Sequence, residues 1–305
     1  SFPTRRSSDL AYDITDERSA ETLVADALKA CEGADYVIFA GGLNKDWMQD
    51  AEGTDRVDYN LPYGQNEVIE ALAAVRSDLV VVNVSGNAVA MPWADKVGAI
   101  IQDWYLGSEA GNSLADVLSG AVCPSGKLPF TIPVALEDGP LKTPEQYPGV
   151  KGEDGIWQEE YSEGIYVGYR WYEKTGVKPR FAFGYGLSYT SFAIGEPKLS
   201  SKVLRDKLTV TVPVENTGDV RGAEVVQLYI GADNSVVDRP VKELKGFEKV
   251  WLNPGEKSSV SFTIDRQTVS FFDTEIHDWN AEAGDYTIYI GSSSDNISST
   301  ARFSL

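Results

Sequence analysis

Two unbroken apolar runs near the start of the chain constrain its fold most strongly. The first covers residues 35–40 (DYVIFA) and ends at a glycine pair, and the second covers residues 79–84 (LVVVNV) and ends at Ser-Gly-Asn. Runs without polar alternation are typical of strands that are buried on both faces, as in a parallel sheet. We expect helices over residues 14–31, 63–75 and 108–118, and a third short strand over 97–102. This alternation predicts an α/β sandwich with a mostly parallel sheet.

The last third of the chain has a different pattern. Apolar and polar residues alternate strictly over residues 208–214, and the turn sequence Asn-Thr-Gly-Asp follows directly. We expect further strands over residues 225–230, 260–264 and 286–290. Seven or so short strands in about 100 residues, separated by turns, are typical of an all-β sandwich.

These patterns predict four segments. Residues 1–10 (SFPTRRSSDL) look like the translation of a sequencing adapter, so we expect them to be non-native and the natural protein to begin upstream. Residues 11–140 are expected to form the α/β sandwich, and residues 196–305 the β-sandwich. Residues 141–195 are rich in glycine, proline and aromatic residues, and we expect a linker that packs on both domains.

Charge and composition exclude several classes of function. The chain has 27 Lys and Arg against 46 Asp and Glu, a net charge of −19 that repels phosphate backbones and anionic lipids. We therefore expect no nucleic-acid or membrane partner. The single histidine, His277, and the two distant cysteines, Cys31 and Cys123, do not have the close spacing of a metal site. The two cysteines are expected to be small thiols, although a pairing between them stays open.

The segment after the first predicted strand is the best candidate site. In an open α/β sheet, ligands bind beyond the carboxyl ends of the strands. Residues 41–61 form a loop of about 20 residues there, far longer than the usual 2 to 6. Residues 41–56 contain four carboxylates, Trp47 and Arg56. Carboxylates beside an indole suit sugar chemistry, and the alternative is a solvated acidic loop that only holds its own shape.

Four motifs then give a more specific indication. They are GGLN…AEGTDR…LPYGQ at 41–65, SGKLPFTIP at 125–133, FAFGYGLSYTSF at 181–192, and GAEVVQLYI…RPVKELKGFEKVWLNPGE at 222–256. With these four motifs in this order and spacing, the chain resembles the C-terminal part of a glycoside hydrolase family 3 β-glucosidase. The resemblance implies an α/β sandwich followed by a fibronectin type III-like domain, and it covers nearly all of residues 11–305.

The resemblance also implies a role for the long loop. It assigns the general acid/base of a retaining hydrolysis of terminal β-D-glucosyl or related β-glycosyl residues to Glu52, with Asp50 as the rival. Trp47, Asp50 and Arg56 are the candidate substrate-binding residues. The family's aspartate nucleophile lies on an N-terminal (β/α)₈ barrel in a Ser-Asp-Trp type motif, which this sequence does not contain.

We therefore expect a fragment that is inactive alone, with a β-glycoside and the missing barrel as its partners. No metal or organic cofactor is expected. The full protein is expected to be secreted or periplasmic. The main alternative is a non-catalytic carbohydrate-binding or structural two-domain protein. A hydrolase or transferase of another type is a weaker alternative, because the sequence has no nucleophile elbow and no glycine-rich phosphate loop.

Overall fold

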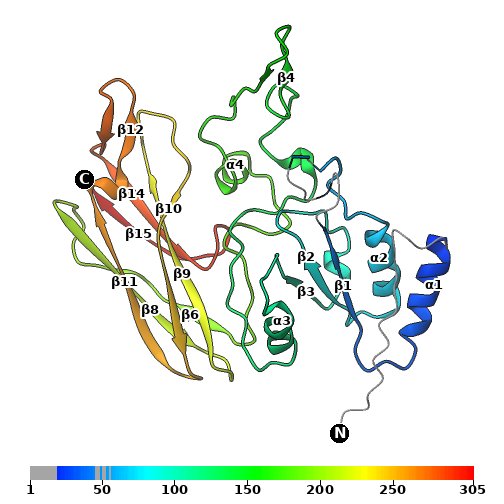
Figure 1. The fold of residues 1–305 in the computed structure, drawn as a ribbon. Helices are drawn as coiled ribbons and strands as arrows, with labels where there is room; N and C mark the ends of the chain where they lie inside the picture. Colours follow the sequence, from blue (N-terminus) through cyan, green and yellow to red (C-terminus); the bar gives the residue numbers. More distant parts are fainter. Residues whose placement is uncertain (1–18, 45–48, 50–52, 55) are drawn as a thin grey trace. The chain divides into compact units, whose positions relative to one another are not determined.

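The protein forms two compact units, which Figure 1 shows as a ribbon. The computed structural model describes residues 19–44, 49, 53–54 and 56–305. One unit contains the described residues up to Leu114 together with Val134–Leu136, and the other contains Ala115–Pro133 and Glu137–Leu305.

The first unit is built on a parallel sheet. Its strands are β1 (Ile38–Gly42), β2 (Val80–Val84) and β3 (Ala99–Gln102), in the order β1-β2-β3. Both pairings are parallel, and Phe39, Val81 and Ile100 lie in one row across the sheet. The apolar runs thus form parallel strands, as the sequence predicts.

Helices cover this sheet through apolar faces. In α1 (Ala20–Ala30), the Ser19 side chain caps the first turn by accepting the Thr22 N–H, and Leu23 and Ala27 are buried. In α2 (Gln65–Val75), Val68, Ile69 and Leu72 are buried, and the helix packs against β1 and α1. The turn η1 (Ala94–Lys96) leads into β3, and α3 (Ala110–Leu118) follows it. The predicted first helix begins at Ala20 in the structure, and residues 14–18 lie outside the described part.

The second unit contains an antiparallel β-sandwich. One sheet has the order β10-β9-β14-β15, and the other has the order β11-β8-β6 with β7 also paired to β8. The strands are β6 (Phe192–Ile194), β7 (Lys198–Leu199), β8 (Lys207–Asn216), β9 (Gly222–Ala232), β10 (Glu243–Leu252), β11 (Lys257–Asp265), β14 (Asp285–Gly291) and β15 (Ile297–Ser304). Alternate residues of β8 (Leu208, Val210, Val212 and Val214) are fully buried between the sheets. The strict alternation in the sequence therefore marks the core face, as predicted.

The segment between the two predicted domains belongs to this second unit. Ile132 forms an antiparallel bridge with Phe181, and the Leu128 N–H donates to the Tyr185 carbonyl at 2.8 Å. The rings of Tyr169 and Phe183 stack at 5.0 Å between centroids. The second unit therefore includes residues upstream of the predicted boundary at residue 140. The reason is that these backbone hydrogen bonds join the segment with Leu128 and Ile132 to the segment with Phe181 and Tyr185. Packing of this segment on both domains stays a prediction.

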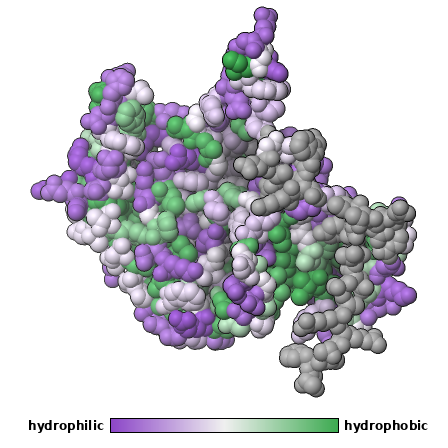
Figure 2. Space-filling view, in the orientation of Figure 1, coloured by the Kyte–Doolittle hydropathy of each residue, from purple (hydrophilic) through white to green (hydrophobic). Residues whose placement is uncertain are grey.

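Several short elements decorate the second unit. They are η2 (Leu136–Asp138) at the boundary between the units, β4 (Val150–Lys151), β5 (Trp157–Gln158), α4 (Tyr169–Thr175), α5 (Arg266–Val269), β12 (Phe271–Asp273) and β13 (Asp278–Asn280). The β4–β5 hairpin exposes Ile156 and Trp157, and hydrophobic atoms appear in green on its projection in Figure 2. Among the described helices, none has the length and apolar character that crossing a membrane requires.

Candidate active site

The carboxyl ends of β1 and β2 meet where the candidate loop begins. Gly42 ends β1 beside Val84, and the Leu43 N–H donates to the Val84 carbonyl at 2.8 Å. Gly42 has φ +140°, and a Cβ atom there would lie 2.0 Å from the Val84 oxygen. A Cβ at Gly41 would lie 2.4 Å from Oε1 of Gln65. The glycine pair therefore permits close approach of neighbouring groups, which is a packing role and gives no support to phosphate binding.

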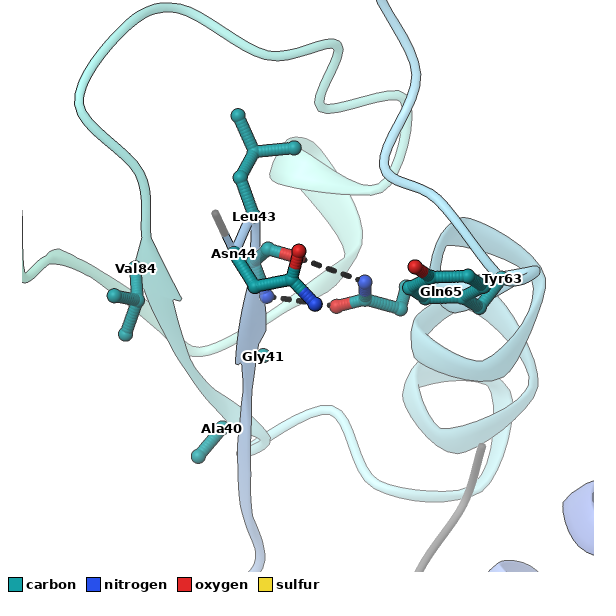
Figure 3. A pocket seen from close by; sticks show the side chains of 8 residues that line it. Ala40, Gly41, Leu43, Asn44, Tyr63, Gln65 and Val84 are labelled. Carbon is teal, nitrogen blue, oxygen red and sulfur yellow. Dashed lines mark hydrogen bonds between the residues drawn. The ribbon is translucent and has the colours of Figure 1, made fainter. Parts of the chain in front are cut away.

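A buried amide fixes the end of β1 to α2. Gln65 is fully buried, accepts the Gly42 N–H at 2.7 Å and donates through Nε2 to the Gly42 carbonyl at 2.9 Å. Figure 3 shows both bonds as dashed lines between the first residue of α2 and the strand. Because Gln65 satisfies both backbone groups of Gly42, the chain leaves the sheet in a defined direction at the start of the loop.

A second amide connects three points of the loop. Gln49 is 9% exposed; its Oε1 accepts the Asn44 N–H at 3.2 Å, and its Nε2 donates to the Tyr63 hydroxyl. A pocket of about 300 Å³ lies beside this link. Its lining residues are Ala40, Gly41, Gly42, Leu43, Asn44, Tyr63, Gln65 and Val84. The described part of the loop is thus attached to the edge of the sheet.

Arg56 forms another attachment. Its Nη2 donates to the Ala88 carbonyl at 2.6 Å, in the segment that follows β2, and its guanidinium lies over the Tyr59 ring at 5.9 Å from the centroid. The Tyr59 carbonyl in turn accepts the Ala90 N–H at 2.9 Å. These contacts hold the residues after the EGTDR motif against the neighbouring loop.

The ends of β2 and β3 carry a network of polar side chains, in which Asn83 and Ser85 are buried and Gln102 is half-buried. Asn83 Nδ2 donates to Ser85 Oγ at 3.0 Å and to Gln102 Oε1 at 2.7 Å. Gln102 Nε2 donates to the Ser85 carbonyl at 3.0 Å. Connected hydrogen bonds of this kind rigidify the edge on which the loops stand.

One carboxyl at this edge is not among the predicted site residues. Asp103 directly follows β3, and its N–H donates to the Asn83 carbonyl at 2.9 Å. Burial raises the pKa of the Asp103 carboxyl above its ordinary value. Its position at the end of a predicted strand is the signal that could have identified it, since polar groups there face the binding edge.

The structure locates only part of the predicted site. Of the four predicted residues, Arg56 is described, whereas Trp47, Asp50 and Glu52 lie outside the described residues. The described residues contain no cluster of three or more His, Cys, Asp or Glu side chains that could hold a metal ion. Cys31 and Cys123 are both free thiols, with Cys123 buried and Cys31 half-buried.

A small parallel α/β unit with its loops anchored at the carboxyl edge, followed by a β-sandwich, defines the class of this protein. The sequence matches two family models, the glycosyl hydrolase family 3 C-terminal domain over residues 5–189 and a fibronectin type III-like domain over residues 224–294. The first match covers more than half of the chain and includes most of the predicted linker. The chain belongs to glycosyl hydrolase family 3.

Curated relatives agree with this assignment. The chain is 49% identical over 295 residues to a beta-glucosidase of Bacteroides ovatus, covering 95% of this chain and 39% of the relative. It is 43% identical over 288 residues to the thermostable beta-glucosidase B of Acetivibrio thermocellus, covering 94% of this chain and 37% of the relative. The chain thus spans less than two fifths of the length of these relatives.

Solved structures of the family have a similar fold. A beta-glucosidase from Kluyveromyces marxianus in complex with glucose matches 95% of this chain and 34% of its own, with a TM-score of 0.86 and 42% identity. A family 3 beta-glucosidase from Bifidobacterium adolescentis matches 97% of this chain and 42% of its own, with a TM-score of 0.87 and 37% identity.

Proposed function

We propose that this chain supplies the general acid/base of a retaining β-glucosidase. The family membership and the relatives named beta-glucosidases support this activity. The full enzyme would hydrolyse the O-glycosidic bond of terminal β-D-glucosyl or related β-glycosyl residues, with no metal or organic cofactor, outside the cytoplasm. The observation that carries the proposal is the anchored loop, in which Gln49 and Arg56 attach the two sides of the EGTDR motif to the edge of the sheet.

In this proposal Glu52 acts twice. Its carboxylic acid first donates a proton to the glycosidic oxygen while the bond to the anomeric carbon breaks and a carboxylate nucleophile bonds to that carbon. The ionised Glu52 then accepts a proton from water, whose oxygen attacks the anomeric carbon and releases the sugar from the nucleophile. Trp47 and Asp50 would contact the sugar, and Arg56 would shape the loop.

The nucleophile must come from another part of the protein. Retaining hydrolysis requires two carboxyl groups about 5 to 5.5 Å apart on opposite faces of the sugar. Asp50 is two residues from Glu52, so the two carboxylates belong to one short segment and are poorly suited to flank a sugar ring. An aspartate on a (β/α)₈ barrel fills this role in our proposal.

A fusion tests this proposal. This chain would replace the matching part of the Bacteroides ovatus relative, and hydrolysis of an aryl β-glucoside would be measured for the fusion and for the chain alone. We expect turnover by the fusion and none by the chain alone. In the fusion, Glu52→Gln should lower kcat by about 10²- to 10⁴-fold for a poor leaving group. Asp50→Asn tests the rival carboxylate, and because Asp50 is proposed to contact the sugar, it should change KM more than kcat.

Two results would contradict the proposal. Turnover by the isolated chain would show that it holds a complete site. A fusion that binds glucose but is inactive, with a correctly folded barrel, would favour the non-catalytic carbohydrate-binding alternative.

A further inference from the structure

The side chain of Gln49 links Asn44, at the start of the loop, to Tyr63, just before α2. It accepts a hydrogen bond from the backbone of Asn44, five residues earlier, and donates one to the hydroxyl of Tyr63, fourteen residues later. Gln49 itself is only 9% exposed, whereas Tyr63 is 40% exposed, so both hydrogen bonds are partly buried. Removing either partner would leave one end of the buried Gln49 amide without that hydrogen bond.

The backbone at Tyr63, whose hydroxyl accepts the Gln49 hydrogen bond, has an unusual conformation. Tyr63 has φ +61°, in the left-handed region that large side chains rarely adopt, and Gly64 follows with φ +70° as the N-cap of α2. The next residue, Gln65, is held against Gly42 by two hydrogen bonds. Backbone strain of this kind persists where surrounding contacts fix it, and such residues cluster at functional sites.

Arg56 forms the second anchor, on the other side of Glu52. Its guanidinium donates to the Ala88 carbonyl at 2.6 Å and lies over the Tyr59 ring. Glu52 is therefore three residues after one anchored side chain and four residues before another.

We propose that Gln49 and Tyr63 are positioning residues, whose hydrogen bond sets the place of the segment that carries the acid/base carboxylate. This inference rests on the proposed function of Glu52. Neither residue is assigned a chemical step. Their effect would be geometric, because a misplacement of about 1 Å in a reacting group can lower the rate by about 10²-fold.

The first test uses the chain as it stands. Backbone amide hydrogen exchange would be followed by mass spectrometry in the wild type, Gln49→Leu and Tyr63→Phe. We expect faster exchange in peptides from residues 43–63 in both variants, and unchanged exchange in β8. Tyr36→Phe is the matched control, because Tyr36 is 86% exposed and should leave every peptide unchanged. Unchanged exchange over residues 43–63 in both variants would overturn the proposal.

The second test separates positioning from a general loss of structure, in the active fusion described above. Gln49→Leu and Tyr63→Phe should lower kcat/KM, which reports formation of the glycosyl-enzyme, at least 10-fold for an aryl β-glucoside with a poor leaving group. An activated leaving group needs no proton, so kcat/KM for it should change little, even where the later attack of water is slowed. The double variant should lose no more than either single variant, since all three remove the same link.

The outcomes distinguish this inference from the proposed function. Equal losses of kcat/KM for the poor and the activated leaving group, or no loss for either, would overturn the positioning role, whatever the exchange data show. If Glu52→Gln itself shows no dependence on the leaving group, then the proposed function fails. The exchange experiment would still report whether the Gln49–Tyr63 link holds the loop.

Discussion

Gly42 has both a backbone conformation and a neighbour that exclude any other residue. Its φ is +140°, and an added Cβ would lie 2.0 Å from the Val84 carbonyl oxygen, on the adjacent strand. The Gly42 N–H donates a hydrogen bond to Gln65 Oε1, and the Gly42 carbonyl accepts one from Gln65 Nε2. The glycine that ends β1 is therefore what lets β2 and α2 meet at the start of the candidate loop.

We predict that Gly42→Ala destabilises the first unit by more than about 2 kcal/mol, since a backbone atom of the central strand must move. Gly107→Ala is the control, because nothing lies within 4 Å of an added Cβ there and its backbone φ is ordinary. Urea unfolding followed by circular dichroism would measure both. A Gly42→Ala variant as stable as the control would contradict this account of the strand end.

At the scale of elements, a partly buried ion pair joins α4 to the β-sandwich. Lys242 donates to Glu173 of α4, and the two side chains are 9% and 15% exposed. Lys242 also lies over the rings of Tyr229 and Tyr289. Burial raises the pKa of the Glu173 carboxyl above its ordinary value even though the Lys242 charge acts in the opposite direction. The pair is therefore costly to split.

We predict that Lys242→Met lowers the free energy of unfolding by about 3 kcal/mol at pH 7, because Glu173 is left buried without its partner. A raised carboxyl pKa in the folded state means that stability falls as the pH rises from the ordinary value of 4.5 through the raised value. The loss should therefore be smaller at pH 4, where Glu173 is largely protonated in both states.

Lys174→Met is the control for this ion pair. Lys174 is the next residue along α4, and its side chain and that of its partner Asp238 are 48% and 66% exposed, so its removal should cost less than about 1 kcal/mol. Equal losses for the two variants at pH 7, or a Lys242→Met loss that does not depend on pH, would contradict the ion-pair account.

Elements with a simple apolar pattern were predictable, and those held by distant contacts were not. The run at residues 79–84 predicts β2, and the alternation at residues 208–214 predicts β8, because burial on both faces or on one face leaves a local pattern. Strand β10 has no clean alternation of buried and exposed residues, and its pairing with β9 shifts register between Leu244 and Gly246. The short β4–β5 and β12–β13 hairpins were not predicted either, since each strand has only two or three residues.

The start of the candidate loop at the carboxyl end of β1 was predictable, whereas its attachments were not. The long loop and its carboxylates follow the first predicted strand in the sequence, and that this loop forms the site stays a prediction. The link from Gln49 to Tyr63 depends on one amide meeting one hydroxyl across fourteen residues, and no local pattern encodes such a contact. For the same reason the raised pKa of Asp103 emerges only from its folded surroundings.

At the scale of the whole molecule, the chain is one part of a larger family architecture. It spans 39% of the Bacteroides ovatus relative and 34% of the solved Kluyveromyces marxianus chain. The proposed reaction is therefore divided between two parts, with the proton donor on the α/β unit and the nucleophile on a barrel. Such a division requires that the loop be held on its own unit, and the contacts of Gln49 and Arg56 are two attachments in its described part.

The most direct measurement of this central claim is azide rescue of Glu52→Ala in the active fusion. Without the acid/base, an activated aryl β-glucoside should still form the glycosyl-enzyme intermediate, but water should attack it slowly. Azide needs no proton removed, so it should restore turnover and yield a β-glucosyl azide with retained configuration. Failure of azide to restore turnover, or rescue of Asp50→Ala instead, would show that Glu52 is not the acid/base.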